Sequence, residues 1–415
     1  MALKKNLIVT IAVFAVFSGL LLRYLDRVPP RHYCDFRVYH HTALKVLKGQ
    51  DIYFRDTLAV TPFKYSPFFA FCFAPFGLLP IKLAASFFFA LNFILAIALF
   101  YLASEVTQAR MRLRALPGRK LALLYGLGAL FLLRFIFLVW DSGQVTILMD
   151  VLLLAGLVLL FKGKDVAAGA CIASAILIKY TPVIFVPYLI LRKQFKAAVW
   201  TMVFVVVFLL LPALAVGIQK ETAYLSSWIP SIIETSLDKK SFTDTENQSL
   251  ISMAIRFFSD SEKGINVMRL TFAQGKSLGC AFAACLYVLV LIPPFGKQRD
   301  QRMDYALLFS FLPLFNPNGW LVNFVALAVP YSLLIGYLIE IKWKDRFVVI
   351  CVFAGFVLTA LMAHDIVGKH AETRAELLSN VTIGALYLVA ALLKLKFGRM
   401  NQIVQAGNHK EKGSI

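Results

Sequence analysis

Long apolar runs, separated by short basic clusters, recur along almost the whole chain and constrain its fold more than any other feature. They start near Leu7 and continue to Leu395. A helix needs roughly 20 residues to cross about 30 Å of hydrocarbon. With 60% hydrophobic and only 16% charged residues, this 415-residue chain lies outside the composition of soluble domains. We therefore predict a single all-α integral membrane domain, residues 1–415.

Basic clusters mark cytoplasmic loops, so the crossings between them can be counted. The count gives about 12 spans, with both termini in the cytoplasm. The predicted spans are residues 7–22, 82–104, 120–140, 144–161, 166–179, 182–191, 197–216, 277–294, 304–315, 320–341, 347–363 and 379–395. The run Pro67 to Pro80, with prolines at both ends, predicts a re-entrant segment or a further short helix.

The remaining polar segments all fall on the non-cytoplasmic side of this topology. They are a first loop at 23–66, a turn at 141–144, a break at 179–182, a second large loop at 217–275 and a break at 316–318. Irregular backbone is tolerated at membrane depth only where it is buried in protein or lines a wet cavity. We therefore expect a cavity that opens on this face.

Positive charge in the first loop is unusual for an external segment. The basic residues there are Arg23, Arg27, Arg31, Arg37, Lys45, Lys48, Arg55 and Lys64. Either the orientation is inverted or the loop binds an anion, such as the phosphate of a lipid.

The formal net charge of +20 does not indicate nucleic-acid binding, because the basic residues form short clusters between apolar runs. The six cysteines have no C-x-x-C pair or metal-ligand spacing, so we expect neither a metal site nor a cofactor. Nucleotide-binding and soluble-hydrolase motifs are absent from the sequence. A cytosolic nucleotide-driven enzyme or pump is therefore disfavoured.

Asp35 opens a segment that reads as a helix lying along the membrane surface and ending at Gly49. As an N-cap, Asp35 would have a structural role. As a carboxylate at the membrane face, it could act as the general base for an acceptor hydroxyl. Both roles are compatible in one residue. The nearby Lys64 and Tyr65 are either interfacial anchors or ligand contacts.

Lys179 ends an apolar run and precedes a Pro break, which places its ammonium at or just below the membrane interface. It is either a snorkelling side chain or a counter-ion for phosphate. Arg134 lies inside a predicted span, where Asp150 on the next span is a candidate partner. In the second loop, helix capping alone explains the polar cluster Thr245 to Ser249, which precedes a helix that carries Arg256.

An ordered series of motifs resembles glycosyltransferase family 87, polytopic enzymes of the GT-C fold. The first-loop pattern consists of Asp35, Tyr39, Ala43, Leu47-Lys48-Gly49 and Ile52-Tyr53, then Phe63 to Pro67 and Pro75 to Pro80. The later motifs are Gly143-Gln144-Val145, Ile178 to Pro182 and Asn247-Gln248-Ser249. Together these motifs cover most of the chain. The resemblance implies a GT-C-like bundle with extracytoplasmic juxtamembrane helices in the first loop.

The resemblance also implies transfer of a hexose, most often mannose, from a polyprenyl-phosphate donor to a hydroxyl of a lipid or glycan acceptor. The reaction would occur on the outer face of the bacterial inner membrane, with inversion and with Asp35 as the catalytic base. Arg37, Lys64 and Lys179 would stabilise the charge that develops on the leaving phosphate. The other implied substrate contacts are Tyr65, Gln144, Asn247, Arg256, Asn316 and Trp320.

The chain departs from the family pattern in one late motif. Several relatives carry a His shortly after the Trp of that motif, whereas this chain reads Asn316-Pro317-Asn318-Gly319-Trp320-Leu321-Val322-Asn323. Asn323 is the candidate substitute for that His.

A membrane transporter or lipid flippase would use similar broken helices, but it should show paired halves, and the sequence has no internal repeat. A non-catalytic partner in a membrane assembly is the third alternative.

Overall fold

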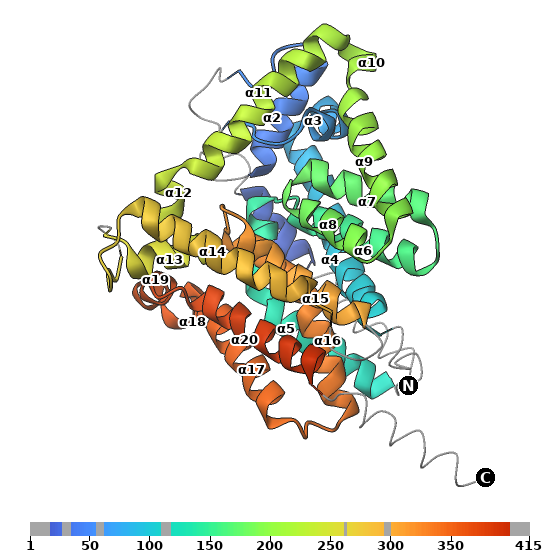
Figure 1. Ribbon diagram of the computed structural model, residues 1–415. Helices are drawn as coiled ribbons and strands as arrows, with labels where there is room; N and C mark the ends of the chain where they lie inside the picture. The colour runs from blue at the N-terminus through green and yellow to red at the C-terminus, as the bar shows by residue number, and fades with distance from the viewer. Residues whose placement is uncertain are drawn as a thin grey trace, which may run out of the picture. The chain divides into compact units, whose positions relative to one another are not determined.

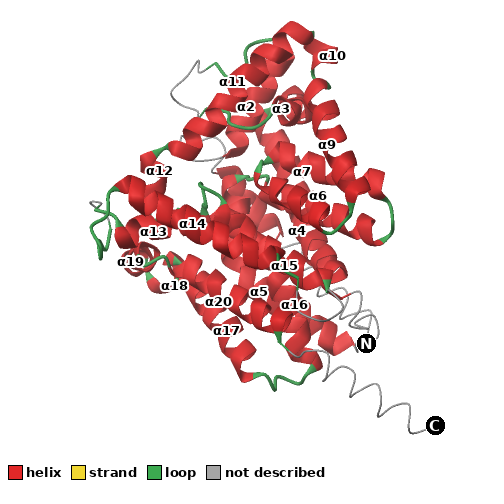
Figure 2. Cartoon of the chain, in the orientation of Figure 1, coloured by secondary structure: helices red, strands yellow, loops and turns green. Residues whose placement is uncertain are grey.

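The computed structural model describes residues 17–26, 35–54, 62–108, 118–260, 264–293 and 300–398. Within these ranges the chain is helical, and its loops are short (Figure 2). Extended pairing is limited there to two isolated bridges, Asn247 with Trp320 and Ser259 with Leu270. The all-α prediction is confirmed. Most of the first predicted span, residues 7–22, lies outside the described ranges, as do Arg27, Arg31 and Arg55 of the first loop.

Among the described residues, six helices are long and apolar enough to cross a membrane, fewer than the 12 predicted spans. They are Ile81–Thr107, Gly118–Ser142, Phe195–Val216, Phe272–Leu291, Leu321–Glu340 and Asn380–Phe397. Shorter apolar helices occupy Pro67–Leu78, Thr146–Phe161, Asp165–Ile178, Thr181–Leu191 and Arg346–Leu361. The predicted segments therefore form helices, but nearly half of them do not reach the length that a straight crossing needs.

The chain divides into two compact units. Unit 1 comprises Met1–Ala98, Ile136–Pro182 and Lys196–Glu234. Its elements are α2 (Asp35–Leu47), α3 (Pro67–Phe73), η1 (Ala74–Leu78), α6 (Thr146–Phe161), α7 (Asp165–Ile178), α9 (Phe195–Leu210) and α10 (Ala213–Val216), with parts of α4 (Ile81–Gln108), α5 (Gly118–Ser142) and α11 (Ile218–Leu237). Helix α6 packs along α7, and α2 packs against α3 and η1 (Figure 1).

Unit 2 comprises Leu99–Phe135, Val183–Phe195 and Thr235–Ile415. Its elements are α8 (Phe185–Leu191), α12 (Lys239–Thr243), α13 (Leu250–Phe258), α14 (Phe272–Leu291), α15 (Gln301–Phe315), η4 (Leu321–Leu327), α16 (Ala328–Glu340), α17 (Arg346–Phe356), η5 (Val357–Leu361), α18 (His364–Val367), α19 (Lys369–Leu377) and α20 (Asn380–Phe397). Helix α13 lies along α14, and α20 packs against both α15 and α17 (Figure 1).

Buried charges in unit 2 are paired across helices that are distant in sequence. The Asp304 carboxylate on α15 accepts hydrogen bonds from Arg192 at 2.7 Å and from Tyr188 at 3.2 Å. Its second oxygen lies 2.8 Å from the ammonium of Lys396 on α20. A buried carboxylate with two cationic partners ties α8, α15 and α20 together.

Arg134 is also paired, but not with the expected Asp150. Its guanidinium donates at 2.8 Å to both Glu372 and Glu376 on α19. The expected partner was wrong because helix periodicity suggests only neighbouring spans, whereas these glutamates lie more than 230 residues away in sequence. Arg134 thus anchors α19 to α5.

Replacing Arg134 with Leu should lower the free energy of unfolding by about 3–5 kcal/mol, because the buried Glu376 and the partly buried Glu372 lose their cation. Thermal unfolding of the detergent-purified protein measures this effect. Arg374→Leu is the matched control, since Arg374 lies exposed on the same α19. Equal stability of the two variants would contradict the anchoring role.

Candidate active site

The candidate site residues chosen from the sequence divide between the two units. Asp35, Arg37, Lys64, Tyr65, Gln144 and Lys179 belong to unit 1. Asn247, Arg256, Asn316 and Trp320 belong to unit 2.

Asp35 stands at the start of α2, as the sequence predicted. The helix ends at Leu47, and Gly49 follows with a φ of +63°. The Oδ2 atom of Asp35 accepts a hydrogen bond of 2.6 Å from Nε2 of Gln144. The helix N-terminus also favours a negative charge at this position. Arg37 lies half-buried on the same helix, two residues further on.

Gly143 lets the chain bring Gln144 up to α2. Its φ is +66°, in the left-handed region that glycine adopts without strain. A Cβ at this position would lie 2.7 Å from the Cβ of Phe36, the residue after Asp35, and would also clash with the Tyr24 hydroxyl. The absence of a side chain at Gly143 therefore lets the Gly143-Gln144 pair pack closely against the first turn of α2.

Lys179 lies where α7 ends and its backbone becomes extended. Its ammonium donates a hydrogen bond of 2.6 Å to the hydroxyl of Thr146, the first residue of α6. Asp150, one turn further along α6, is fully buried. Its two carboxylate oxygens have no hydrogen-bond partner among the described residues. Because Thr146 is two residues after Gln144, its hydrogen bond from Lys179 brings positive charge close to the Gln144 turn.

The Lys64-Tyr65-Ser66 segment is fixed through its backbone. Trp228 donates its indole N–H to the Lys64 carbonyl at 3.3 Å, and the Tyr53 hydroxyl donates to the Tyr65 carbonyl at 2.7 Å. The Ser66 hydroxyl donates to the carbonyl of Leu177 at 2.6 Å, near the end of α7. The Lys64 side chain is exposed. The segment therefore presents a cation from a rigid backbone.

Burial raises the pKa of the Asp35 carboxyl, while the charge of Lys179, the hydrogen bond from Gln144 and the charge of Lys64 oppose that shift. The net pKa lies above the usual range of an aspartate. A carboxylate with a raised pKa can take up a proton, and basic groups beside it can at the same time hold an anion.

Within the described ranges, no three His, Cys, Asp or Glu side chains could hold a metal ion.

In unit 2, Asn247 holds two loops together. Its amide nitrogen donates to the carbonyls of Ser241 at 2.9 Å and Pro317 at 2.7 Å. Its amide oxygen accepts from the backbone N–H groups of Ser249 at 3.2 Å and Gly319 at 3.0 Å. These bonds occupy the amide fully, so the side chain organises the fold here. Its contact with substrate stays a prediction.

Arg256 on α13 bonds to the same loop and is fully buried. Its guanidinium donates to the carbonyls of Asp244 at 2.9 Å and Asn247 at 2.7 Å. It also donates to the Ser379 hydroxyl at 2.7 Å. Arg256 therefore fixes the polar motif of the second loop, and its contact with a donor phosphate likewise stays a prediction.

The break after α15 is an Asn-stabilised turn. The side-chain oxygen of Asn316 accepts from the backbone N–H of Asn318 at 3.0 Å. Half-buried Trp320 precedes η4, and its carbonyl accepts from the backbone N–H of Asn323 at 2.9 Å. The Asn323 amide donates to the Asn318 carbonyl at 3.0 Å, so it helps to close this turn.

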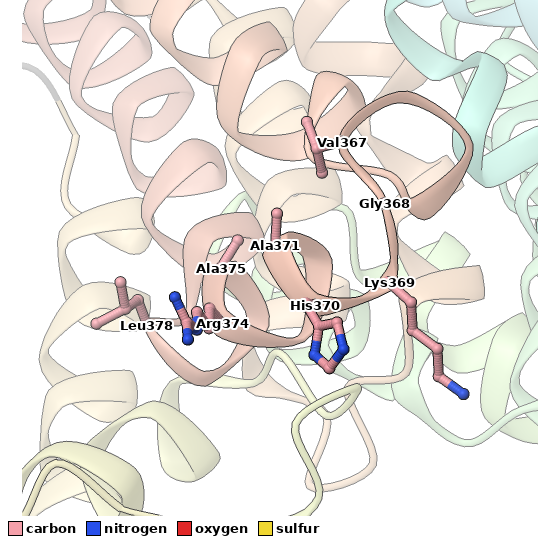
Figure 3. A pocket seen from close by; sticks show the side chains of 8 residues that line it. All are labelled: Val367, Gly368, Lys369, His370, Ala371, Arg374, Ala375 and Leu378. Atoms are coloured by element: carbon pink, nitrogen blue, oxygen red, sulfur yellow. The ribbon is translucent and has the colours of Figure 1, made fainter.

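A surface groove of unit 2 is lined by none of the site residues that were predicted from the sequence. It runs along α19 and carries three basic side chains (Figure 3). The residues that line it are Val367, Gly368, Lys369, His370, Ala371, Arg374, Ala375 and Leu378.

From the sequence, Tyr39 was only one member of the first-loop motif, with no role of its own. Its ring is buried, but its hydroxyl donates to Oε1 of Gln144 at 3.1 Å. The signal was available, because Asp35 and Tyr39 are four residues apart on one helix face, and a buried phenol needs a hydrogen-bond partner. It was missed because the partner lies 105 residues away.

Comparison with protein families gives one match. The model of glycosyltransferase family 87 matches residues 63–317, more than half of the chain. Lys64, Gln144, Lys179 and Asn247 fall inside the matched range, whereas Asp35 precedes it. The comparison with curated proteins and the comparison with solved structures gave no match.

Asn247→Ala should lower the free energy of unfolding by about 2 kcal/mol or more, because it leaves buried backbone groups of both loops without partners. Lys64→Ala is the control, since this exposed side chain should contribute little to stability. Thermal unfolding in detergent compares the two variants. Wild-type stability of Asn247→Ala would contradict the loop-clamping role.

Proposed function

Because the chain belongs to glycosyltransferase family 87, we propose that it transfers a hexosyl residue from a polyprenyl-phosphate donor to a hydroxyl of a lipid or glycan acceptor. Mannose is the proposed sugar. Family membership supports a membrane glycosyltransferase over the transporter alternative. The proposed location is the bacterial inner membrane, with the helices of both length classes making about 12 crossings and the reaction on the outer face.

The observation that carries this proposal is the surroundings of Asp35. A single displacement needs a base for the acceptor hydroxyl and positive charge for the leaving phosphate. In unit 1 the Asp35 carboxylate lies in the electrostatic field of Lys179 and Lys64. Unit 1 therefore carries a candidate for each role, which supports the proposal.

In the proposed reaction, Asp35 takes the proton of the acceptor hydroxyl as the hydroxyl oxygen bonds to the anomeric carbon. The bond from that carbon to the phosphate oxygen breaks, and its electron pair leaves with the lipid phosphate. Attack opposite to the leaving group inverts the anomeric configuration. Lys179, Lys64 and Arg37 stabilise the phosphate charge. Tyr65, Asn316 and Trp320 are proposed substrate contacts.

Asp35→Asn should lower transfer by about a hundredfold or more, because an amide cannot take up the proton. The assay uses protein in lipid nanodiscs, radiolabelled polyprenyl-phosphate mannose or glucose, and a membrane-lipid extract. Asp51→Asn, an exposed aspartate of the same loop, should keep wild-type transfer. Normal turnover by Asp35→Asn would remove this base, and absence of wild-type transfer with both sugars would contradict the function.

Lys179→Met should raise the KM for the donor about tenfold or more, because a charge-assisted contact to phosphate is lost. The KM for the acceptor should stay within about twofold. Steady-state kinetics with each substrate varied in turn provides the measurement. Lys162→Met, at the exposed far end of α6, should change neither constant. An unchanged donor KM in Lys179→Met would leave Lys179 as a snorkelling residue.

A further inference from the structure

We propose that Gln144, oriented by Tyr39 and Tyr65, is a positioning residue that fixes the Asp35 carboxylate and favours its charged form. This proposal rests on the proposed function of Asp35 as a base. It gives Gln144 a role different from substrate contact, and it adds Tyr39 to the residues that serve the reaction.

The orientation of the Gln144 amide is set at its oxygen end. The backbone N–H of Val145 donates to Oε1 at 3.1 Å. Both phenol oxygens lie within hydrogen-bond distance of the same atom, Tyr39 at 3.1 Å and Tyr65 at 3.3 Å. A backbone N–H can only donate, so rotating the amide by 180° would turn an NH₂ group toward this donor. The oxygen therefore faces Val145 and the phenols.

Two phenols hold this end of the amide together. The hydroxyls of Tyr39 and Tyr65 lie 2.8 Å apart, so one can donate to the other while the second donates to Gln144. The Tyr39 ring is packed edge-on against Tyr65, Phe69 and Phe73, with centroid distances of 5.1 to 5.4 Å. This packing restricts the phenol to one position. The Gln144 side chain is thus held by side chains from α2 and from the segment before α3.

With the oxygen end fixed, only the NH₂ end of Gln144 can face Asp35. It donates to Oδ2 at 2.6 Å. A donor at this distance stabilises the charged carboxylate over the protonated acid. It also holds the carboxylate plane, which leaves Oδ1 for the proton of an acceptor hydroxyl.

This hydrogen bond matters because Asp35 is in a setting that disfavours its charge. Burial is the largest influence on the pKa of Asp35 and raises it, whereas the hydrogen bond from Gln144 lowers it. Removing the donor should therefore raise that pKa further. At neutral pH a larger fraction of Asp35 would then be protonated and unable to act as a base.

Gln144→Glu provides the main test, because it keeps the side-chain size and replaces the NH₂ donor with a carboxylate oxygen. The acid limb of the pH profile of kcat/KM should move up by about one pH unit or more. Transfer at pH 7 should fall about tenfold or more and recover at alkaline pH, with the donor KM unchanged. A purely structural defect would not recover with pH.

Tyr39→Phe gives a second test if Gln144→Glu does not fold. It removes one hydroxyl and keeps the ring packing, so the acid limb should move in the same direction by a smaller amount. Tyr331→Phe is the matched control, since Tyr331 is a buried tyrosine of unit 2 that bonds to Thr359. Its pH profile should equal that of the wild type.

The outcomes separate this proposal from the proposed function. If Asp35→Asn is inactive but both Gln144→Glu and Tyr39→Phe keep the wild-type acid limb, the positioning role is overturned and the base is retained. If Asp35→Asn transfers sugar normally, the proposed base fails, and the positioning role fails with it. A donor KM that rises in Gln144→Glu without any shift of the acid limb would return Gln144 to a substrate contact.

Discussion

Every backbone N–H and C=O group that a broken helix leaves inside this apolar chain needs a hydrogen-bond partner, and that constraint organises the structure. Three polar side chains meet it at separate breaks. The Ser66 hydroxyl bonds to the carbonyl of Leu177, Oε1 of Gln144 accepts from Val145, and the Asn247 amide bonds to Pro317 and Gly319. These three side chains belong to the motifs that the sequence singled out, so those motifs mark places where helices are interrupted.

Buried cations also need hydrogen-bond partners, and the kind of partner differs from one cation to the next. Arg134 bonds to two glutamates and Arg192 bonds to Asp304, so these guanidinium groups serve the packing of unit 2. The Arg256 guanidinium donates its hydrogen bonds to backbone carbonyls and to the Ser379 hydroxyl. Lys179 donates to the Thr146 hydroxyl of α6, and it differs from these arginines because it lies in the electrostatic field of Asp35, the proposed base. That setting supports the proposed contact of Lys179 with the donor phosphate.

The sequence predicted local features well, because they depend on neighbouring residues. The helix from Asp35, the glycine that follows it and the break at Lys179 come from capping, turn and hydropathy patterns. The number of membrane crossings was less accessible, since several apolar runs form helices too short to span alone. Hydropathy detects that a segment is apolar, but it does not determine whether a short helix tilts, re-enters or is enclosed by protein.

The sequence did not identify which distant residues pair with one another, even where it indicated that a buried polar group needs a partner. Arg134 was matched to Asp150 because only helix neighbours can be inferred from periodicity, and the glutamates of α19 gave no pattern that pointed to α5. The partner of the Tyr39 hydroxyl was missed for the same reason, since the position of Tyr39 in its helix indicates only an apolar face. Its ring does pack there, while its hydroxyl finds Gln144 through a turn that Gly143 permits. A tyrosine combines an apolar ring with a polar hydroxyl, and helix periodicity predicts only where the ring packs.

The proposed role of Asp35 as a base depends on a balance between burial of its carboxyl and the hydrogen bond and charges that stabilise the carboxylate. An aspartate in water is almost always ionised at neutral pH, but it is a weak base. Burial strengthens such a base by raising its pKa, and it thereby also favours the protonated acid. Gln144, Lys179 and Lys64 oppose that shift. An amide whose oxygen is already held by the protein is well suited to this purpose, because it can offer the carboxylate only its donor end.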